Sequence, residues 1–197
     1  MRLASKAAAT RNYAPMGGLF RQITQPEGVD YIIVPCHSSE RRDYIPIEFV
    51  SHEIIAGNAA LIIPSATLYH FGVLTSRMHN AWMRAVCGRL KSDYRYSKDI
   101  VYNNFIWPMS RGEDAASTKE IETAAQEILD VRKRYLDADP ECTLAILYNP
   151  ETMPPDLLKA HQHLDTLVDK AYGKKFANDA ERVAHLFDLY AEAVKDE

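Results

Sequence analysis

The chain has 197 residues, of which 47% are apolar and 25% charged, and its 23 Lys+Arg against 27 Asp+Glu give a net charge of −4. This length suits one domain or two small ones, and the apolar fraction excludes a disordered chain. No stretch approaches the roughly 18 to 20 apolar residues of a membrane helix, and no secretory signal follows Met1. We therefore expect a cytoplasmic protein without a membrane partner.

Charge is distributed unevenly along the chain. Residues 1–100 hold 12 Lys+Arg against 8 Asp+Glu, whereas residues 101–197 hold 11 against 19. An acidic total argues against nucleic-acid binding, which needs local positive potential, but this asymmetry predicts two regions with different roles. Three cysteines without a CxxC pair predict neither a disulfide framework nor a zinc site.

Short strands and one long helix are predicted in the first region. Residues 2–14 are rich in Ala, Arg and Lys and are expected to start a helix. Apolar runs predict strands over 31–34, 45–49 and 59–63, and Pro46 places the second at a sheet edge. An apolar stripe at helical spacing predicts one helix from Leu68 to Ala85, capped at Gly88, with extended segments at 94–96 and 100–105.

The second region is predicted to be helical. Residues 117–120 form a capping-box pattern, prolines and Asp156 mark a helix start before Gly173, and residues 178–181 form a second capping box. Three amphipathic helices of this length can bury one shared core. We therefore expect an α+β protein, a small mixed α/β region followed by a C-terminal bundle of about three helices.

Known catalytic and metal-binding motifs do not occur in the sequence. It contains neither GxGxxG nor GxxxxGK[ST], and neither GxSxG nor HExxH. His161 and His163 are two apart on a predicted helix, where side chains point about 200° apart and cannot share one ion. The sequence thus assigns no catalytic residue, no metal and no cofactor to this chain, and leaves enzymatic activity undecided.

The segment from Arg77 to Lys98 is strongly basic. It holds six cations and a single acid, Asp93, interleaved with aromatic residues. Cations at this density are able to neutralise DNA phosphates. A solvated helix face beside ordinary core aromatics explains the same composition, so the segment alone leaves both interpretations open.

Four longer motifs occur in the order YIIVPCHSSERRDYIPIEF, FGVLTSRMHNAWMRAVCGRLKSDYRYS, IVYNNFIWP and LAILYNPETMPPDLLKAHQHLDTLVDKAYG. This succession resembles the C-terminal third of the MmeI-like (type IIL) family of adenine-specific DNA methyltransferases, which are often fused to a nuclease in a single-chain restriction-modification enzyme. The resemblance runs from about Arg11 to about Ala193. Ile106 departs from it, because family members usually have proline there.

The resemblance implies a division of the chain and a set of partners. Residues 1–111 correspond to a target recognition domain, incomplete at its N-terminus, and residues 112–197 to a C-terminal helical domain. In this family the catalytic motif and the S-adenosylmethionine fold lie upstream, so the cofactor is expected in the parent enzyme and not in this chain. The implied partners are double-stranded DNA and an upstream methyltransferase domain of the same polypeptide, with a nuclease where one is fused.

The resemblance also implies base-reading residues. Lys91 and Asp93 correspond to a pair that reads one base pair, and a lysine that donates to guanine with an aspartate that accepts from cytosine suits G·C. We expect the segment to be extended, so that residues two apart share a face. An ion pair of Asp93 with Arg89 or Arg95 is the alternative. Arg95 is expected to be a second base reader, beside Ala59 on a neighbouring strand.

Further residues are expected to touch or approach DNA. The expected phosphate contacts are Ser39, Arg41, Arg42, Arg77, Arg89 and Lys98, and the residues expected near DNA are His79, Tyr96, Asn103 and Asn104. A structural role is the alternative for Arg42, which can hold the strand connection, and for the asparagines, which can satisfy turns. The resulting hypothesis is sequence-specific DNA recognition as part of an S-adenosylmethionine-dependent adenine N6 methyltransferase of a restriction-modification system. The alternative is a protein-interaction module whose acidic helical half binds a partner.

Overall fold

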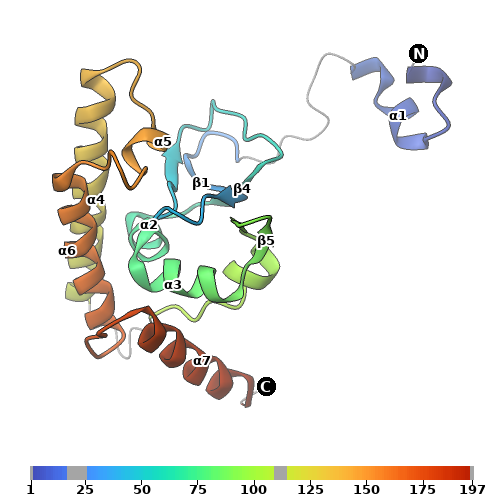
Figure 1. The fold of residues 1–197 in the computed structure, drawn as a ribbon. Helices are drawn as coiled ribbons and strands as arrows, with labels where there is room; N and C mark the ends of the chain where they lie inside the picture. The colour runs from blue at the N-terminus through green and yellow to red at the C-terminus, as the bar shows by residue number, and fades with distance from the viewer. Residues whose placement is uncertain (1, 17–25, 109–114, 196–197) are drawn as a thin grey trace.

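The first part of the chain combines strands and helices, and the second part is helical (Figure 1). The computed structural model describes residues 2–16, 26–108 and 115–195. The strands are β1 (Tyr31–Pro35), β2 (His37–Ser38), β3 (Glu48–Val50), β4 (Ala60–Pro64), β5 (Gly88–Leu90) and β6 (Asp93–Arg95). The helices are η1 (Arg2–Ala4), α1 (Ala8–Asn12), η2 (Ala14–Met16), α2 (Leu68–Thr75), α3 (Arg77–Val86), η3 (Lys98–Tyr102), α4 (Ala115–Ala138), α5 (Leu144–Leu147), α6 (Pro155–Ala171) and α7 (Asp179–Lys195). The predicted α+β class is confirmed, and the boundary predicted after residue 111 lies outside the described residues.

Two antiparallel sheets meet at Cys36. One has the strand order β3-β1-β4 and the other β2-β6-β5. The amide of Cys36 donates to the carbonyl of Ala59, and its carbonyl accepts from the amide of Tyr96, both at 2.9 Å. The backbone is therefore hydrogen-bonded continuously from the start of β4 to the end of β6.

The strand predicted over residues 45–49 lies at a sheet edge, as Pro46 indicated, but it begins only at Glu48. The amide of Ile45 donates to the side chain of Asn80 at 2.9 Å and so is not available to a neighbouring strand. The predicted strands over 31–34 and 59–63 are confirmed as β1 and β4, with ends that differ by one residue.

The prediction of one helix from Leu68 to Ala85 is wrong, because the chain breaks at Ser76 into α2 and α3. Ser76 has extended backbone angles (φ −70°, ψ 163°). Its hydroxyl donates to the carbonyl of Val73 at 2.7 Å and accepts from the amide of His79, so one side chain ends the first helix and caps the second. The cap predicted at Gly88 is also wrong, because this glycine already belongs to β5.

The extended segment predicted over residues 100–105 is wrong as well, since residues 98–102 form a π-helix. The amide of Asn103 donates to the carbonyl of Lys98 at 2.8 Å, which is the five-residue step of a π-turn. The side-chain amide of Asn104 donates to the carbonyls of Asp99 and Ile100 at 2.8 and 3.1 Å. Asn104 thus has the turn-satisfying role that the sequence left as an alternative.

The ends of the C-terminal helices agree with the sequence in part. The capping box predicted at 117–120 is wrong, because α4 begins before it. The start of α6 at Pro155 is confirmed, and Gly173 follows the helix with φ +85°. Before α7, the side chain of Asn178 accepts from the amide of Glu181 at 3.0 Å, while the carboxylate of Glu181 accepts from residue 177. The second capping box is therefore confirmed for the bond that Asn178 accepts, but Glu181 does not return a bond to the amide of Asn178.

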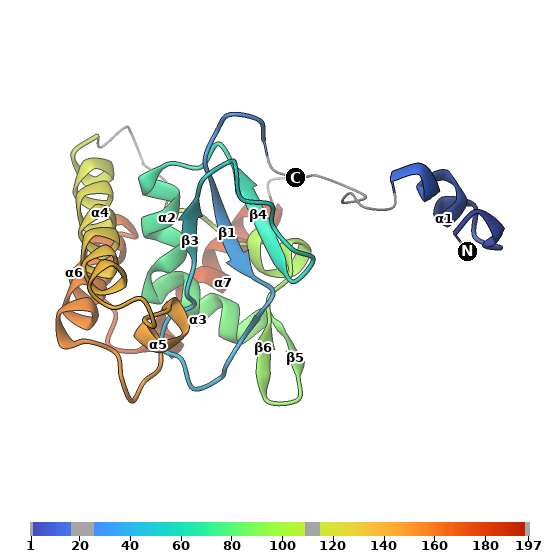
Figure 2. The same ribbon diagram turned by 90° about the horizontal axis from the view of Figure 1, so that it is seen from above.

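The helical part shares its core with the first part. Helices α4 and α6 run side by side, α4 also packs on α2, and α7 packs on α3 (Figures 1 and 2). One continuous cluster of buried side chains includes Phe71, Leu74, Ile121, Ile128 and Leu164. Neither part therefore closes its core alone.

A buried polar cluster sits in this core. Arg132, on the inward stripe of α4, donates to the hydroxyl of Tyr148 at 2.6 Å and to the carbonyl of Ile47 at 2.7 Å. The hydroxyl of Tyr148 lies 2.7 Å from Nε2 of His161. Burial raises the pKa of Tyr148 to about 12 and lowers the pKa of His161 well below its usual range. His163 is exposed, so the two histidine side chains have different surroundings.

Candidate nucleic-acid interface

The β5–β6 hairpin protrudes from the body of the molecule (Figure 2). Leu90 pairs with Asp93, which leaves Lys91 and Ser92 as a two-residue turn. Lys91 has φ +57°, a left-handed conformation that is uncommon outside glycine. The expectation that Lys91 lies in an extended segment is therefore wrong. Its exposed side chain instead leaves the tip of the hairpin.

The two sides of strand β6 have different surroundings. Side chains alternate along a strand, and here Tyr94 is buried while Asp93 and Arg95 are exposed. Leu90 is the cross-strand partner of Asp93 and is 54% exposed. The hairpin thus presents one solvent face that carries an acid, a cation and an apolar side chain, with Lys91 at its tip. We call this surface, formed by Leu90, Lys91, Asp93 and Arg95, the hairpin face.

Asp93 is held by the neighbouring loop. Its carboxylate accepts a hydrogen bond of 3.3 Å from the backbone amide of Glu40. Arg89 lies over the ring of Tyr94, 4.1 Å from its centroid, and donates to the carbonyl of Ser92 at 2.9 Å. Within residues 26–108 and 115–195 no ion pair of Asp93 occurs, so the ion-pair alternative has no support in the structure.

Ala59 was expected on a strand beside Arg95, but it lies in the turn that precedes β4. Its carbonyl accepts from Cys36, and the next backbone bond runs from Tyr96 to Cys36. The exposed Ala59 and the hairpin face are thus one strand apart in a continuous backbone network. The backbone of Ala59 is linked through Cys36 to the end of the strand that carries Asp93 and Arg95, and base reading by these residues stays a prediction.

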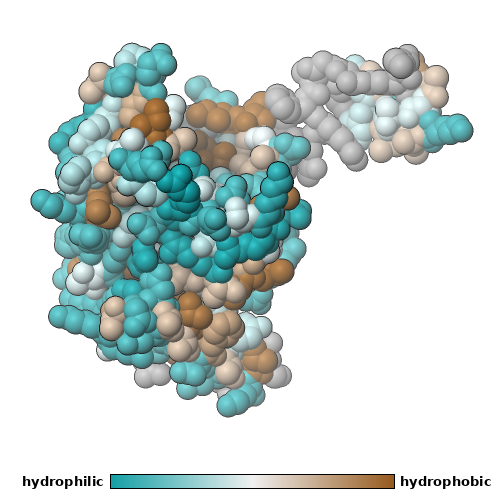
Figure 3. Space-filling view, in the orientation of Figure 1, coloured by the Kyte–Doolittle hydropathy of each residue, from teal (hydrophilic) through white to brown (hydrophobic). Residues whose placement is uncertain are grey.

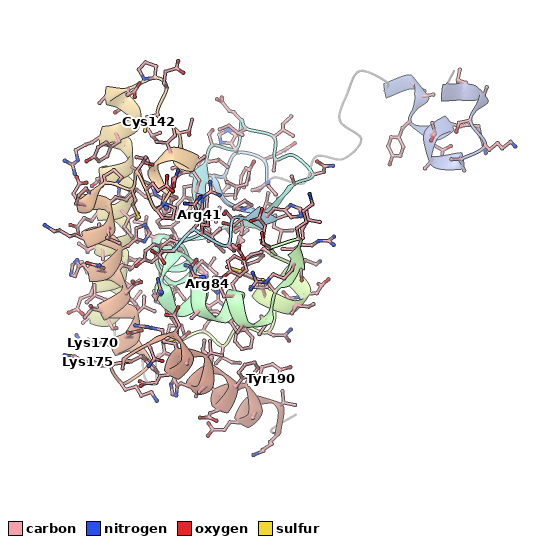
Figure 4. The ribbon with its side chains drawn as sticks, viewed as in Figure 1. Arg41, Arg84, Cys142, Lys170, Lys175 and Tyr190 are labelled. Carbon is pink, nitrogen blue, oxygen red and sulfur yellow. The ribbon has the colours of Figure 1, made fainter. Side chains whose placement is uncertain are left out.

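The loop over residues 38–43 carries the predicted phosphate contacts Ser39, Arg41 and Arg42. The hydroxyl of Ser39 accepts from the amide of Arg41 at 3.3 Å, and its carbonyl accepts from the amide of Arg42 at 3.2 Å. The side chain of Arg41 forms an ion pair with Glu151, in the turn between α5 and α6 (Figure 4). Both of these side chains are about two thirds exposed, at 65% and 68%.

Two arginines of α3 are engaged by carboxylates of the chain. Arg77 pairs with Asp179 at 2.8 Å and with Asp43 at 3.1 Å. Burial of Arg77 opposes its charge, but the two carboxylates outweigh this and raise its pKa. Arg84, labelled in Figure 4, donates to the carbonyls of Arg42 and Asp43 at 2.7 and 2.6 Å and lies 3.4 Å from Asp179. The structure therefore gives Arg77 partners within the protein.

The remaining predicted residues divide into buried and exposed ones. His79 and Tyr96 are buried, 2.9 Å apart between Nε2 and the hydroxyl, and burial lowers the pKa of His79 to about 3. Lys98 and Asn103 are exposed, and Lys98 lies 3.9 Å from Asp99. Trp82 is buried in the core, and Trp107 is partly buried and packs against it.

Two groups that neighbour the hairpin face escaped the sequence argument, the amide of Glu40 and the side chain of His37. His37 is exposed and pairs directly with Arg95 across β2 and β6. Strand β2 has only two residues, which is too short for an alternating apolar pattern to be recognised. In the sequence, only the first family motif, through residues 38–42, pointed to this region. Among the described residues no group of acids, histidines or cysteines is able to hold a metal ion, and no helix is long and apolar enough to cross a membrane.

An exposed hairpin with charges of both signs stands on a mixed α/β region, and a helical region packs against that region. Residues 1–109 match the sequence model described as "MmeI, target recognition domain", and residues 113–196 match "MmeI, C-terminal domain". The chain belongs to the MmeI family, in which it comprises the target recognition and C-terminal domains.

Two known proteins resemble the chain over most of its length. "DNA methyltransferase A" of Bacillus subtilis (strain 168) is 45% identical over 162 residues, which are 82% of this chain and 18% of that protein. A solved structure of the type IIL restriction-modification enzyme MmeI in complex with DNA is 46% identical and superposes with a TM-score of 0.86, covering 98% of this chain and 25% of that chain. The chain thus spans about a fifth to a quarter of the relatives that it matches.

Proposed function

We propose that this chain is the part of an adenine N6 DNA methyltransferase of a restriction-modification system that recognises the DNA sequence. The hairpin face carries this proposal. Lys91 at the tip donates to guanine, Asp93 accepts from the amino group of the paired cytosine, and Arg95 reads a second base pair beside Ala59. The family of the chain supports the assignment, as do its two relatives, a DNA methyltransferase and a restriction-modification enzyme in complex with DNA.

The carboxylate of Asp93 favours contact with bases over contact with phosphates. Near phosphates a carboxylate is repelled, whereas in the major groove it meets the donor of cytosine. Phosphate contacts come from the cations around the hairpin face, namely Arg41, Arg42, Arg89 and Lys98, together with Ser39. Arg77 already holds two carboxylates, so we leave it out of this set.

S-adenosylmethionine does not fit the residues of this chain. The sequence lacks a glycine-rich phosphate or nucleotide loop, and the sheets of the described residues are small and antiparallel, without the parallel β–α–β unit of a nucleotide fold. We therefore place the cofactor and the methyl transfer in another part of a longer cytoplasmic polypeptide. The proposed partners of this chain are duplex DNA and that methyltransferase domain, with a nuclease where one is fused.

The base-reading pair is tested by exchanging its charges. In the intact enzyme, Lys91→Glu combined with Asp93→Arg is expected to change the preferred G·C pair to C·G, because each new side chain matches the other base. Sequencing of methylated sites measures this directly. An unchanged recognition sequence would falsify the base-reading assignment.

A protein-interaction module is the competing function, and an apolar surface favours it. Hydrophobic side chains gather over α7 in the lower part of Figure 3, and Phe187 and Val194 of that helix are 47% and 52% exposed. Titration of the 197-residue chain with duplex DNA at increasing salt separates the two functions. DNA recognition requires an affinity that falls steeply with salt, whereas absence of binding at low salt favours the interaction module.

A further inference from the structure

His37 lies beside the hairpin face, on strand β2, although no charge pattern marks it. It is directly opposite Arg95 in the pairing of β2 with β6, and Gly88 is opposite Arg95 on the other side. Cross-strand partners project to the same face of a sheet, with Cβ atoms about 5 Å apart. Ser38, the next residue, is buried beside Tyr94 on the opposite face. The alternation therefore places His37 in one row with Arg95.

The imidazole of His37 is available to a ligand. It is exposed, and within the described residues it forms no hydrogen bond, ion pair or ring contact. A neutral imidazole offers one N–H donor and one acceptor nitrogen. Each base pair presents donors and acceptors in the major groove, so this ring is able to bond to a base edge.

We propose that His37 is a further specificity-determining residue, which reads a base pair adjacent to the one that Arg95 contacts. This inference rests on the proposed function. The spacing of about 5 Å between cross-strand neighbours is close to the rise of about 3.4 Å between stacked bases, so neighbouring side chains meet neighbouring base pairs. Asp93 lies on the same face. Its carboxylate is repelled by phosphates but is able to accept from a base, so this face is expected to meet base edges.

The role of His37 is tested by selection of duplexes. The 197-residue chain binds a library with randomised base pairs, and the bound duplexes are sequenced. His37→Ala is expected to reduce the preference at one base pair about tenfold, adjacent to the pair affected by Arg95→Ala, while other positions keep theirs. His37→Asn is expected to keep a preference at the same base pair but shift it toward adenine, because asparagine bonds to N6 and N7 of adenine.

The matched control is His52→Ala, which removes another exposed imidazole of the recognition region, one that lies 3.4 Å from Asp30. It is expected to leave every preference unchanged. The proposal is overturned if His37→Ala changes no position, or if it weakens all sequences equally, as loss of a phosphate contact does. Circular dichroism checks that His37→Ala is folded. If it is not, the selection with His37→Asn tests the proposal instead.

The same selection separates this inference from the proposed function. If the unmodified chain selects a sequence that Lys91 and Asp93 variants alter, but His37 variants do not, only the role of His37 fails. If the unmodified chain selects no sequence at all, the proposed function fails with it.

Discussion

The hydroxyl of Tyr44 donates a hydrogen bond of 2.6 Å to Oδ2 of Asp165, which lies 121 residues later in the chain. The other oxygen of Asp165 accepts from the backbone amide of Arg77, also at 2.6 Å. Nearby, Arg77 and Arg84 of α3 share Asp179 at the start of α7. These bonds join the loop that carries the proposed phosphate contacts to α6 and α7. The C-terminal helices therefore support the loop that carries the proposed phosphate contacts.

Removal of the Tyr44 hydroxyl is expected to destabilise the protein. Tyr44→Phe keeps the ring, which stacks on His161 at 4.1 Å, but leaves one oxygen of the buried Asp165 without its donor. We expect the free energy of unfolding in urea to fall by about 1–3 kcal/mol. Tyr190→Phe is the control, because this tyrosine of α7 contributes a ring contact with Trp82 and no hydrogen bond among the described residues. Equal losses in the two variants would contradict the role of the Tyr44 bond.

Asp165 should also make stability depend on pH. Burial raises its pKa to about 6, although the bonds from Tyr44 and the amide of Arg77 oppose the rise. The folded state thus binds the proton more tightly than the unfolded state, whose pKa is about 4. This contribution to stability is complete below pH about 4 and is lost as pH rises through about 6.

The measurement is urea denaturation of the protein and of Asp165→Asn at pH 4, 5, 6 and 7. The asparagine does not titrate, so the stability of the unmodified protein relative to this variant is expected to fall by up to about 3 kcal/mol between pH 4 and 7. A difference that stays constant with pH would show that Asp165 titrates alike in both states.

Apolar periodicity located most of the strands and helices. Each of them buries one face in the core, so its apolar residues recur at the spacing of that face. The periodicity missed the break at Ser76 because the apolar stripe continues in phase across a one-residue interruption. The hairpin turn at Lys91 and Ser92 escaped because it lacks the Gly, Asn or Asp that normally marks a left-handed turn. The family motifs, not the periodicity, identified Lys91 and Asp93.

The charge network could not be predicted from sequence. Arg77 looked like a phosphate ligand because its neighbours along the chain are basic, but its partner Asp179 is 102 residues away. Local composition carries no information on such a pairing. Likewise, His79 matched a family motif, and only the structure shows that its ring is buried against Tyr96, the residue after β6.

The close approach of α2 and α4 depends on the absence of a side chain at Gly72. A Cβ there would lie 2.7 Å from Cγ2 of Ile121 and 3.3 Å from Cβ of Ala125. Gly72→Ala is expected to lower the free energy of unfolding by about 1–3 kcal/mol, because the two helices must separate. Gly57→Ala, where no atom lies within 4 Å of the added Cβ, is the control in thermal denaturation and should be nearly neutral.

The ion pair of Arg41 and Glu151 occupies the guanidinium that the proposed phosphate contact needs, so the two would compete. This ion pair is largely exposed, so it contributes little to stability. Glu151→Gln is expected to raise the affinity for any duplex a few-fold at low salt, and Arg41→Ala to lower it for all sequences and reduce the salt slope by about one. Both are measured by titration over a range of salt. A change in sequence preference in either variant would contradict a phosphate contact.

Two substitutions of Lys91 separate the effect of its left-handed backbone on stability from the effect of its amine on base preference. The φ of +57° at Lys91 suits glycine, so Lys91→Gly is expected to be about 1 kcal/mol more stable than Lys91→Ala in urea denaturation. Both variants lose the amine, and we expect both to lose the preference for one G·C pair to the same extent in duplex selection. If Lys91→Gly kept that preference, the conformation of the turn and not the lysine amine would be the determinant. If both variants kept it, Lys91 would not be a base reader.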